Sequence, residues 1–305
     1  MKRFNYSKNS IALIVFAAAI ILGGSMNAAE FNFGNSVNHG PNINRSCADF
    51  YPVVSPDGCT IYFSSDRLGC YGGFDIYVAT RESKDDEWGP IVHLIWPVNT
   101  PNYEMPSSIS ADGLSLYLYS NRAGGKGGFD LWVTTRETTS SPWGTPVNLG
   151  ATLNRSSKQI NLVISSDGLS LYYSSNQTSQ GGFGGYDLWV TTRETTSSSW
   201  GTPVNLGEVV NSPVGDYHPS ISTDGLALFF ASNRTGGYGT VDIYVTTRAS
   251  ISDPWGTPVN LGPKINTPSE DDAPWLSVDG STLYFTSTGH GGYGGGCNGR
   301  FSDPR

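Results

Sequence analysis

Charged residues are scarce in this 305-residue sequence: Asp, Glu, Lys and Arg together make up 14%, whereas aromatic residues make up 12%. Disordered chains need high charge and few aromatics, and coiled coils need abundant Glu, Lys and Leu, so the composition excludes both classes. Basic residues are scarcer than acidic ones, with 18 Lys and Arg against 26 Asp and Glu, so the formal net charge is −8. Because a negative surface repels phosphate backbones, we expect no nucleic-acid partner.

Long apolar runs are also lacking, apart from Ile11 to Leu22. This run follows a basic start and precedes small residues that end at Ala28-Ala29. It is shorter than the roughly 20 residues that span a bilayer as a helix, and the pattern is typical of a secretory signal. We predict a signal peptide over residues 1–29, without a lipid-attachment cysteine, and a periplasmic or secreted protein over residues 30–305 with no membrane span. An uncleaved anchor is the alternative.

Cysteine and histidine number only four each. No paired C-x-x-C or Cys/His spacing suggests zinc, no G-x-S-x-G elbow occurs, and no histidine spacing supports a catalytic triad. We therefore expect no cofactor. The even cysteine count and the predicted oxidising compartment permit disulfides.

What the sequence has in abundance is glycine, at 38 positions, and an internal repeat. Asp-Gly recurs five times at spacings of 55, 55, 57 and 55, and an Asn stands thirteen residues before each of these turns. The Asp-Gly turns begin at Asp57, Asp112, Asp167, Asp224 and Asp279. Trp-Gly recurs at Trp88, Trp143, Trp200 and Trp255. We place the repeats at about 45–99, 100–154, 155–211, 212–266 and 267–305.

Each repeat contains four short segments rich in β-branched and aromatic residues, punctuated by Gly, Pro, Asn and Asp. Their apolar runs are nearly continuous, which predicts strands buried on both faces. Four-stranded antiparallel sheets repeated five times predict an all-β, five-bladed β-propeller. Residues 31–44 match a fourth strand, so we expect this N-terminal strand to join the C-terminal blade and close the ring.

The unit Ser-x-Asp-Gly, then Leu-Tyr-Phe-x-Ser-Asn-Arg, then Gly-Gly-x-Gly-Gly-x-Asp-Leu-Trp-Val-Thr-Thr-Arg resembles the WD40-like (PD40) propeller repeat of TolB-type exported proteins. The match covers essentially the whole chain after the leader. The resemblance implies a non-enzymatic propeller that works through protein–protein contacts in the periplasm or at the cell surface. TolB-type proteins carry six such blades behind an α/β domain, and this chain has five repeats and no such domain.

The fifth repeat departs from the pattern after Gly296, where the Asp-Leu-Trp-Val strand is missing. Two interpretations stay open. Blade five lacks its third strand, or the sequence is a truncated or frameshifted form.

An acid or Gln recurs eight residues before each turn aspartate, at the start of the strand expected to line the central channel. These positions are Asp49, Glu104, Gln159, Asp216 and Asp271. The acids could together hold a cation or receive a basic or hydroxyl-rich ligand, and a pair of them is what a glycosidase requires. The alternative is that each acid holds a loop by accepting backbone N–H bonds.

Positions that differ between repeats point to an asymmetric binding patch. His218 stands where other repeats have Tyr51, Pro106, Asn161 and Ala273, and Trp275 replaces smaller residues. The candidate ligand-binding residues on this rim are Asp49, Glu104, Asp216, Tyr217, His218, Asp271, Asp272 and Trp275. Drift at tolerant positions and filling of a gap between blades are the alternatives.

Other periodic residues are interpreted as structural. The Gly-rich loops lead into strands rather than helices, so they do not resemble phosphate-binding loops. The Asp that begins each third strand and the Arg that follows each second strand bracket one hairpin, which suggests charge-assisted bonding within it.

Cys47, Cys70 and Cys297 map to one rim beside the expected closure seam. We predict a Cys47–Cys297 or a Cys47–Cys70 disulfide that fastens the ring.

Three functions remain open from the sequence. The first is a non-enzymatic binding or scaffold protein for an envelope or extracellular protein partner. The second is a glycan-binding or glycoside-hydrolysing propeller that uses acids at the channel mouth. The third is a degenerate or truncated paralogue with little activity.

Overall fold

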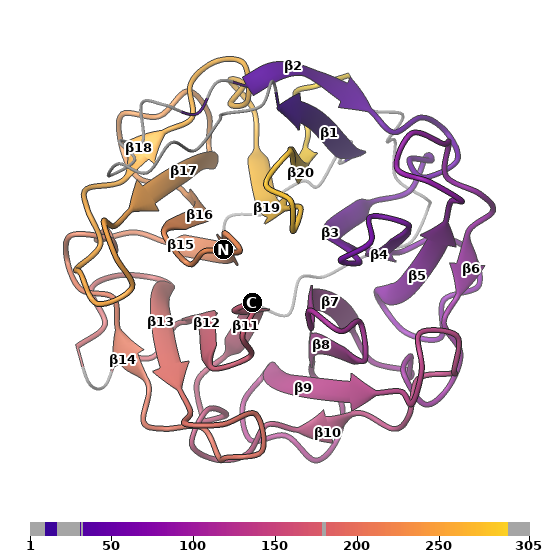
Figure 1. Cartoon of the computed structure of the whole chain (residues 1–305), viewed down its shortest axis with the longest axis horizontal. Coiled ribbons are helices and arrows are strands. Elements are labelled where there is room, and N and C mark those ends of the chain that lie inside the picture. The colour runs from indigo at the N-terminus through magenta and orange to yellow at the C-terminus, as the bar shows by residue number, and fades with distance from the viewer. Residues whose placement is uncertain (1–9, 17–30, 32, 179–180, 292–305) are drawn as a thin grey trace.

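All regular structure in the chain is β. The computed structural model describes residues 10–16, 31, 33–178 and 181–291, and within them the strands form five four-stranded antiparallel sheets. These sheets are arranged as blades around a central axis (Figure 1). No helix occurs in these ranges, and hence none that is long and apolar enough to cross a membrane. The predicted all-β architecture of four-stranded antiparallel blades is confirmed.

The blades are numbered one to five by their inner strands, which lie nearest the axis (Figure 1). The inner strands are β3 (Asp49–Val54), β7 (Glu104–Ile109), β11 (Gln159–Ile164), β15 (Asp216–Ile221) and β19 (Asp271–Leu276). The second strands are β4 (Thr60–Ser65), β8 (Ser115–Ser120), β12 (Ser170–Ser175), β16 (Ala227–Ser232) and β20 (Thr282–Ser287). The third strands are β5 (Asp75–Thr80), β9 (Asp130–Thr135), β13 (Asp187–Thr192), β17 (Asp242–Thr247) and, in blade five, β1 (Ser10–Phe16). The outer strands are β6 (Val92–His93), β10 (Val147–Asn148), β14 (Val204–Asn205), β18 (Val259–Asn260) and β2 (Phe33–Asn38).

The recurring Ser-x-Asp-Gly segments form the turns between inner and second strands. In blade four, Ser222 Oγ donates to Asp224 Oδ1 at 2.5 Å and accepts from the Ala227 N–H at 2.9 Å. Gly225 has a φ of +72°, a conformation that glycine adopts without steric cost. The turn therefore requires both the Asp and the Gly, which explains their recurrence.

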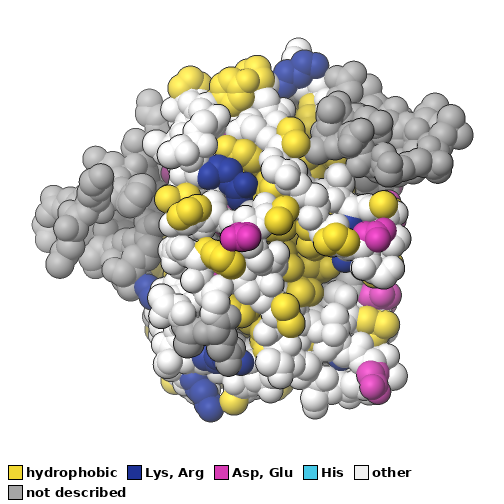
Figure 2. Space-filling view, turned by 90° about the vertical axis from the view of Figure 1, so that its left-hand side faces the viewer, with side chains coloured by type: hydrophobic (Ala, Val, Ile, Leu, Met, Phe, Trp, Pro, Cys, Tyr) yellow, Lys and Arg dark blue, Asp and Glu magenta, His cyan; other side chains and the backbone are white. Residues whose placement is uncertain are grey.

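The second strands are the most buried elements. Every residue of β16 is buried, and the second strands of the other blades are buried from their second residue on. The prediction of strands covered on both faces is confirmed for them. The outer strands of blades one to four have only two residues each, one exposed and one half-buried. Figure 2 shows the outer wall on one side as uncharged polar and apolar surface with isolated charges.

The recurring Asn ties each outer connection to a third strand. Its side-chain oxygen accepts from the N–H of the second residue of that strand, and its amide donates back to the carbonyl of the same residue. The pairs are Asn99 with Ile76, Asn154 with Leu131, Asn211 with Leu188 and Asn266 with Ile243, at 2.8–3.0 Å. This two-way bond explains why the Asn keeps its spacing from the turn.

Blade five combines two strands from the N-terminal part of the chain, β1 and β2, with two from the C-terminal part, β19 and β20. The predicted N-terminal strand, β2, lies in the same sheet as β19 and β20, but it pairs with β1 rather than directly with β20. Ser10–Phe16, which we placed in a leader outside the propeller, instead forms the third strand. A run of apolar and β-branched residues suits both a leader and a buried strand, so hydropathy could not separate the two. Cleavage of the leader stays a prediction.

Blades five and one meet along a seam of side-chain contacts. The inner strands β19 and β3 are in contact. The Tyr51 N–H donates to Thr286 Oγ1 at 3.3 Å, and Asn42 Nδ2 donates to the Trp88 carbonyl at 3.0 Å. The first and last repeats are therefore neighbours in space.

Candidate functional site

The predicted rim acids lie at the first residue of each inner strand and are fully buried. Each accepts a hydrogen bond from the backbone N–H four residues earlier, at 2.5–3.1 Å. The pairs are Arg45 with Asp49, Thr100 with Glu104, Arg155 with Gln159, Ser212 with Asp216 and Thr267 with Asp271. Gln159 makes the same bond without a charge. The shared role of this position is therefore to hold the loop that precedes the strand.

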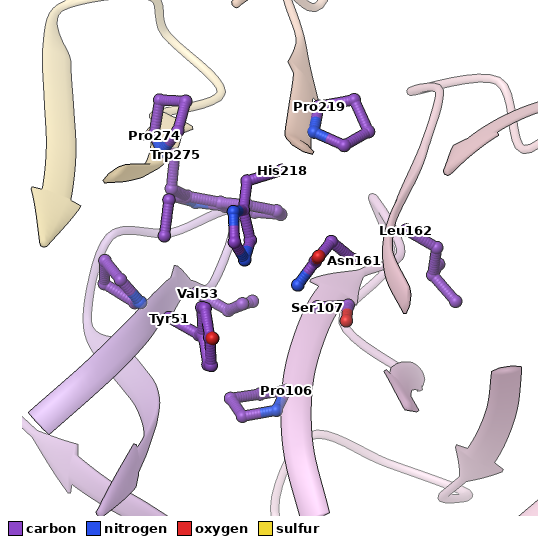
Figure 3. A pocket seen from close by; sticks show the side chains of 12 residues that line it. Tyr51, Val53, Pro106, Ser107, Asn161, Leu162, His218, Pro219, Pro274 and Trp275 are labelled. Atoms are coloured by element: carbon purple, nitrogen blue, oxygen red, sulfur yellow. The ribbon is translucent and has the colours of Figure 1, made fainter. Parts of the chain in front are cut away.

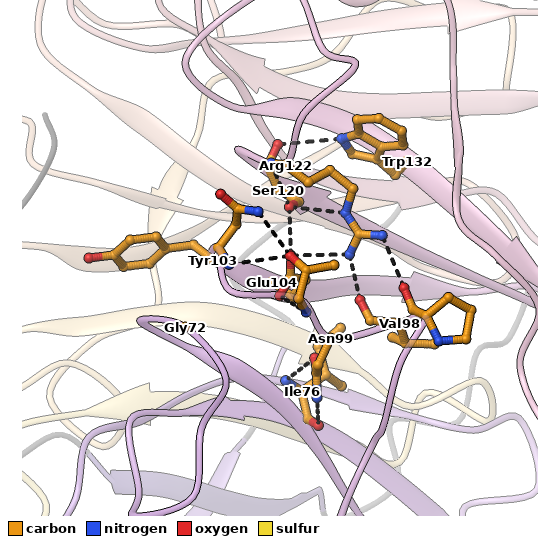
Figure 4. A network of polar contacts seen from close by, with 12 residues as sticks. Gly72, Ile76, Val98, Asn99, Tyr103, Glu104, Ser120, Arg122 and Trp132 are labelled. Atoms are coloured by element: carbon orange, nitrogen blue, oxygen red, sulfur yellow. Dashed lines mark hydrogen bonds and ion pairs between the residues drawn. The ribbon is translucent and has the colours of Figure 1, made fainter.

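Three of these acids also form buried ion pairs with the Arg that follows the second strand. The Nη2 to carboxylate distances are 2.5 Å for Arg67–Asp49, 3.2 Å for Arg122–Glu104 and 2.6 Å for Arg234–Asp216. Each Arg also donates to the carbonyl of the residue before the recurring Asn, as Arg122 does to Val98 (Figure 4). Blade three has Gln177 in place of the Arg and Gln159 in place of the acid.

Burial is the largest influence on these carboxyls, and it raises the pKa of Asp49, Glu104 and Asp271 above the usual range. Hydrogen bonds and the neighbouring guanidinium act in the opposite direction at Asp49 and Glu104. Since the groups are enclosed and already bonded, they do not face a ligand at the channel mouth.

The other periodic charges are structural as expected, although their partners differ from those expected. Each third-strand Asp accepts from a backbone N–H in its Gly-rich loop, as at Asp75 with Tyr71 (2.6 Å), and does not pair with the Arg after the second strand. On the opposite rim, each Arg that follows a third strand lies over the Trp of the Trp-Gly pair. The distances are 4.2–4.3 Å for Arg81–Trp88, Arg136–Trp143, Arg193–Trp200 and Arg248–Trp255. This cation–π contact explains the Trp-Gly repeat.

The inner strands all bulge at the same place, two to four residues after the rim position. In four blades the residue at the bulge has a left-handed backbone although it is not glycine. The φ values are +57° for Tyr51, +50° for Asn161, +51° for His218 and +51° for Ala273. Blade two has Pro106 there. Non-glycine residues in this region carry strain of about 1 kcal/mol or more and concentrate at functional sites.

The bulges turn these side chains into one pocket on the propeller axis (Figure 3). Its volume is about 20 Å³, which is room for one or two water molecules. The residues that line it are Tyr51, Pro52, Val53, Pro106, Ser107, Asn161, Leu162, His218, Pro219, Ala273, Pro274 and Trp275. Every blade contributes, and no Asp or Glu is among these lining residues.

Several polar atoms of the pocket residues are buried and have no hydrogen-bond partner among the residues that the structure describes. They are Ser107 Oγ, Asn161 Oδ1, His218 Nε2 and Trp275 Nε1. Asn161 is 4% exposed and Trp275 is 8% exposed. Leaving such a group unpaired costs about 1–3 kcal/mol. The pocket thus presents both donors and acceptors to whatever occupies it.

The structure brings together only part of the predicted patch. His218 and Trp275 line the pocket, and Asp272 Oδ1 lies 2.7 Å from His218 Nδ1. Tyr217 packs against Tyr186 at a ring distance of 5.3 Å. The remaining predicted acids, Asp49, Glu104, Asp216 and Asp271, are enclosed in the loop networks described above. Comparison of equivalent positions between the repeats did not identify Ser107 or the prolines that line the pocket. It considered one position at a time and could not show where the inner strands bulge.

The cysteines divide into bonded and free. Cys47 is disulfide-bonded, whereas Cys59 and Cys70 are free thiols. The structure therefore does not contain the Cys47–Cys70 alternative. The other predicted partner, Cys297, lies outside the described residues.

In the described part of the chain, no group of three or more His, Cys, Asp or Glu side chains could hold a metal ion. The rim acids accept backbone N–H bonds instead.

No protein-family model matches the chain, and no curated protein matches it. Among solved structures, the chain is similar to an endo-arabinase from Bacteroides thetaiotaomicron, with 14% identity over 82% of this chain and 94% of that one, at a TM-score of 0.54. It is similar to a GH43_12 protein from a capybara gut metagenome, with 14% identity over 92% of this chain and 56% of that one, at a TM-score of 0.51. A putative TolB from Agrobacterium tumefaciens matches with 16% identity over 92% of this chain and 98% of that one, at a TM-score of 0.48. At 14% identity the similarity to the endo-arabinase and to the GH43_12 protein shows the propeller fold alone.

Proposed function

We propose that this chain is a five-bladed, ring-closed propeller of the exported WD40-like type, a non-enzymatic protein that binds a protein partner in the periplasm or outside the cell. The partner docks on the rim around the central pocket and inserts a small polar group into it.

The unpartnered polar atoms of the pocket are the observation that carries this proposal. Asn161 Oδ1 and His218 Nε2 come from different blades and have no hydrogen-bond partner in the described part of the chain. Four strained bulges hold the pocket in shape. A group that pairs with these atoms, displacing water, would recover their lost hydrogen bonds.

Hydrolysis receives less support from the same geometry. A glycosidase needs two carboxyls that flank a sugar in an open site. The inner-strand acids of blades one, two and four are buried in ion pairs with Arg67, Arg122 and Arg234, and a pocket of about 20 Å³ is too small for a sugar ring. Non-hydrolytic glycan binding is the second candidate, because the aromatic rings of Tyr51, His218 and Trp275 line the pocket.

Site-specific photo-cross-linking in cells tests the proposal. A photoreactive phenylalanine analogue replaces Tyr217 on the rim, or Val147 on the outer wall as the matched control, where the side chain is 63% exposed. We expect a discrete protein adduct from the Tyr217 probe alone, which disappears when Asn161→Ala and His218→Ala are added. Adducts only from the Val147 probe would contradict the proposal. Retention in the polysaccharide fraction that the double variant abolishes would favour the glycan candidate.

A further inference from the structure

The third strand of blade five differs from the others in its connection to the chain. In blades one to four, the third strand follows the second through a Gly-rich loop, as β17 follows β16. In blade five, β1 comes from the opposite part of the sequence and lies between β20 and β2 (Figure 1). No hairpin therefore connects β1 to the second strand of its blade, β20.

The register of β1 is nevertheless that of a third strand. Ser10 pairs with Ser287 as Asp242 pairs with Ser232 in blade four, and the pairing continues through Val15 with Thr282. On its other side, Ala12 pairs with Asn38 as Tyr244 pairs with Asn260. The backbones of β20 and β2 thus form a slot that accepts one antiparallel strand.

The sequence of β1 lacks a feature that fastens the other third strands. Each of those begins with an Asp whose carboxylate accepts a backbone N–H from its own loop. Ser10 stands at that register position in β1. The strand that fills the slot therefore has no direct chain connection to the second strand and lacks the Asp with which its counterparts begin.

We propose that the third-strand position of blade five is an exchangeable strand-acceptor site. Ser10–Phe16 fills it in the unprocessed chain, and an extended segment of a partner protein fills it once the leader is removed. The predicted cleavage after residue 29 lies between β1 and β2, so processing leaves β20 and β2 with facing unpaired edges. Such edges recruit a strand through main-chain hydrogen bonds, while side-chain positions give specificity.

The chain itself indicates the chemistry of the incoming segment. Its own third strands read Asp-Ile-Tyr-Val-Ala-Thr, Asp-Leu-Trp-Val-Thr-Thr twice and Asp-Ile-Tyr-Val-Thr-Thr, with the first three residues buried in each. The donor is therefore an extended, proline-free segment with an aliphatic residue followed by an aromatic one. This surface is separate from the central pocket. The proposal rests on the proposed function only for removal of the leader, which the test replaces by cutting with a protease.

The test uses the full-length chain with a specific protease site inserted between Gly24 and Ser25. A fluorescent peptide that copies residues 128–137 is added before and after cutting. We expect the peptide to bind the cut chain at least tenfold more tightly than the uncut chain and to release the 1–24 fragment. A peptide with proline at the positions of Trp132 and Thr134 is the matched control, and it should not bind, since proline has no N–H to donate.

A second comparison addresses the acceptor side. Asn44 is the blade-five equivalent of the Asn residues that bond to third strands, and Asn154 bonds to the third strand of blade two. Asn44→Ala should weaken peptide binding about tenfold, whereas Asn154→Ala should leave it unchanged. Equal peptide binding by cut and uncut chains would overturn the proposal. So would loss of the 1–24 fragment without any peptide binding in its place.

Discussion

The rings of Tyr51 and His218 stack at a centroid distance of 4.8 Å and an interplanar angle of 24°. They come from β3 and β15, in blades one and four, which are not neighbours in the ring. The contact therefore spans the central channel. Both residues have left-handed backbones, so the bulges that position the rings also bring them together.

Replacing His218 with Ala should abolish partner binding and change stability only a little. A stacked aromatic pair contributes about 0.5–1.5 kcal/mol, so we expect the free energy of unfolding to fall by about 1 kcal/mol. Urea denaturation measures it, with Tyr173→Ala as the comparison. Tyr173 is a fully buried core residue, and its truncation should cost about 3–5 kcal/mol. A loss of that size at His218 would identify it as a core residue instead.

Blade three has Gln159 and Gln177 where blade two has Glu104 and Arg122. This difference predicts that replacing both residues of the blade-two ion pair with Gln is tolerated better than replacing Arg122 alone. Arg122→Gln alone leaves the buried Glu104 carboxylate without its guanidinium, and we expect a loss of about 3 kcal/mol. Adding Glu104→Gln should recover the free energy of unfolding to within about 1 kcal/mol of wild type. Chemical denaturation of the two single variants and the double variant measures the coupling. Additive losses would show that the pair is not a unit.

The Arg122→Gln variant should also acquire a characteristic pH dependence. Burial already raises the pKa of Glu104, and removal of Arg122 takes away an opposing influence. A carboxyl whose pKa is raised by folding stabilises the fold below its unfolded pKa, and this stabilisation is lost as pH rises through the folded value. The deficit against wild type should therefore be smaller at pH 4.5 than at pH 7.5. Denaturation at both pH values tests this, and a constant deficit would contradict it.

His39 should give the seam between blades five and one the opposite pH dependence. Burial, aided by the charge of Arg81, lowers the pKa of His39 to about 3. Its Nδ1 accepts from Trp88 Nε1 at 3.2 Å, and its ring stacks on Tyr284. The unfolded chain takes up a proton near pH 6.5 and the folded chain does not, so stability falls as pH drops from about 6.5 towards 3.

The matched variant is His39→Gln, which keeps an acceptor for Trp88 and cannot be protonated. Between pH 7.5 and pH 5, wild type should lose about 2 kcal/mol more than this variant. Other titrating groups are present in both proteins, so the difference isolates His39. Parallel stability curves would show that folding does not shift the pKa of His39, which would contradict this prediction.

The cysteines should differ in reactivity. Burial raises the pKa of the Cys70 thiol to about 11, so its alkylation at pH 8 should be about a hundredfold slower in the folded than in the unfolded chain. Mass spectrometry after iodoacetamide treatment measures this rate. Cys47 should react only after reduction. Alkylation of Cys47 without a reductant would contradict the disulfide.

Most of the fold could be predicted from the repeat because each of its elements makes local contacts. An Asp-Gly turn, an apolar run and a recurring Asn each act within one blade, as Ser222, Asp224 and Gly225 do. The candidate site depended on more distant relations. The sequence could place His218 at a variable position, but not that a bulge would turn it towards Tyr51. It could not separate a rim acid that faces solvent from one enclosed by an Arg eighteen residues later.

The all-β blade architecture and the positions of the turns could be predicted from the amino-acid sequence, because periodic local patterns leave few other ways to bury these strands. The tertiary structure alone decided which charges are enclosed, which polar atoms meet on the axis and which segment completes blade five. Those outcomes depend on contacts between blades and on contacts between the N-terminal and C-terminal strands of blade five. Spacing within one repeat contains no information about them.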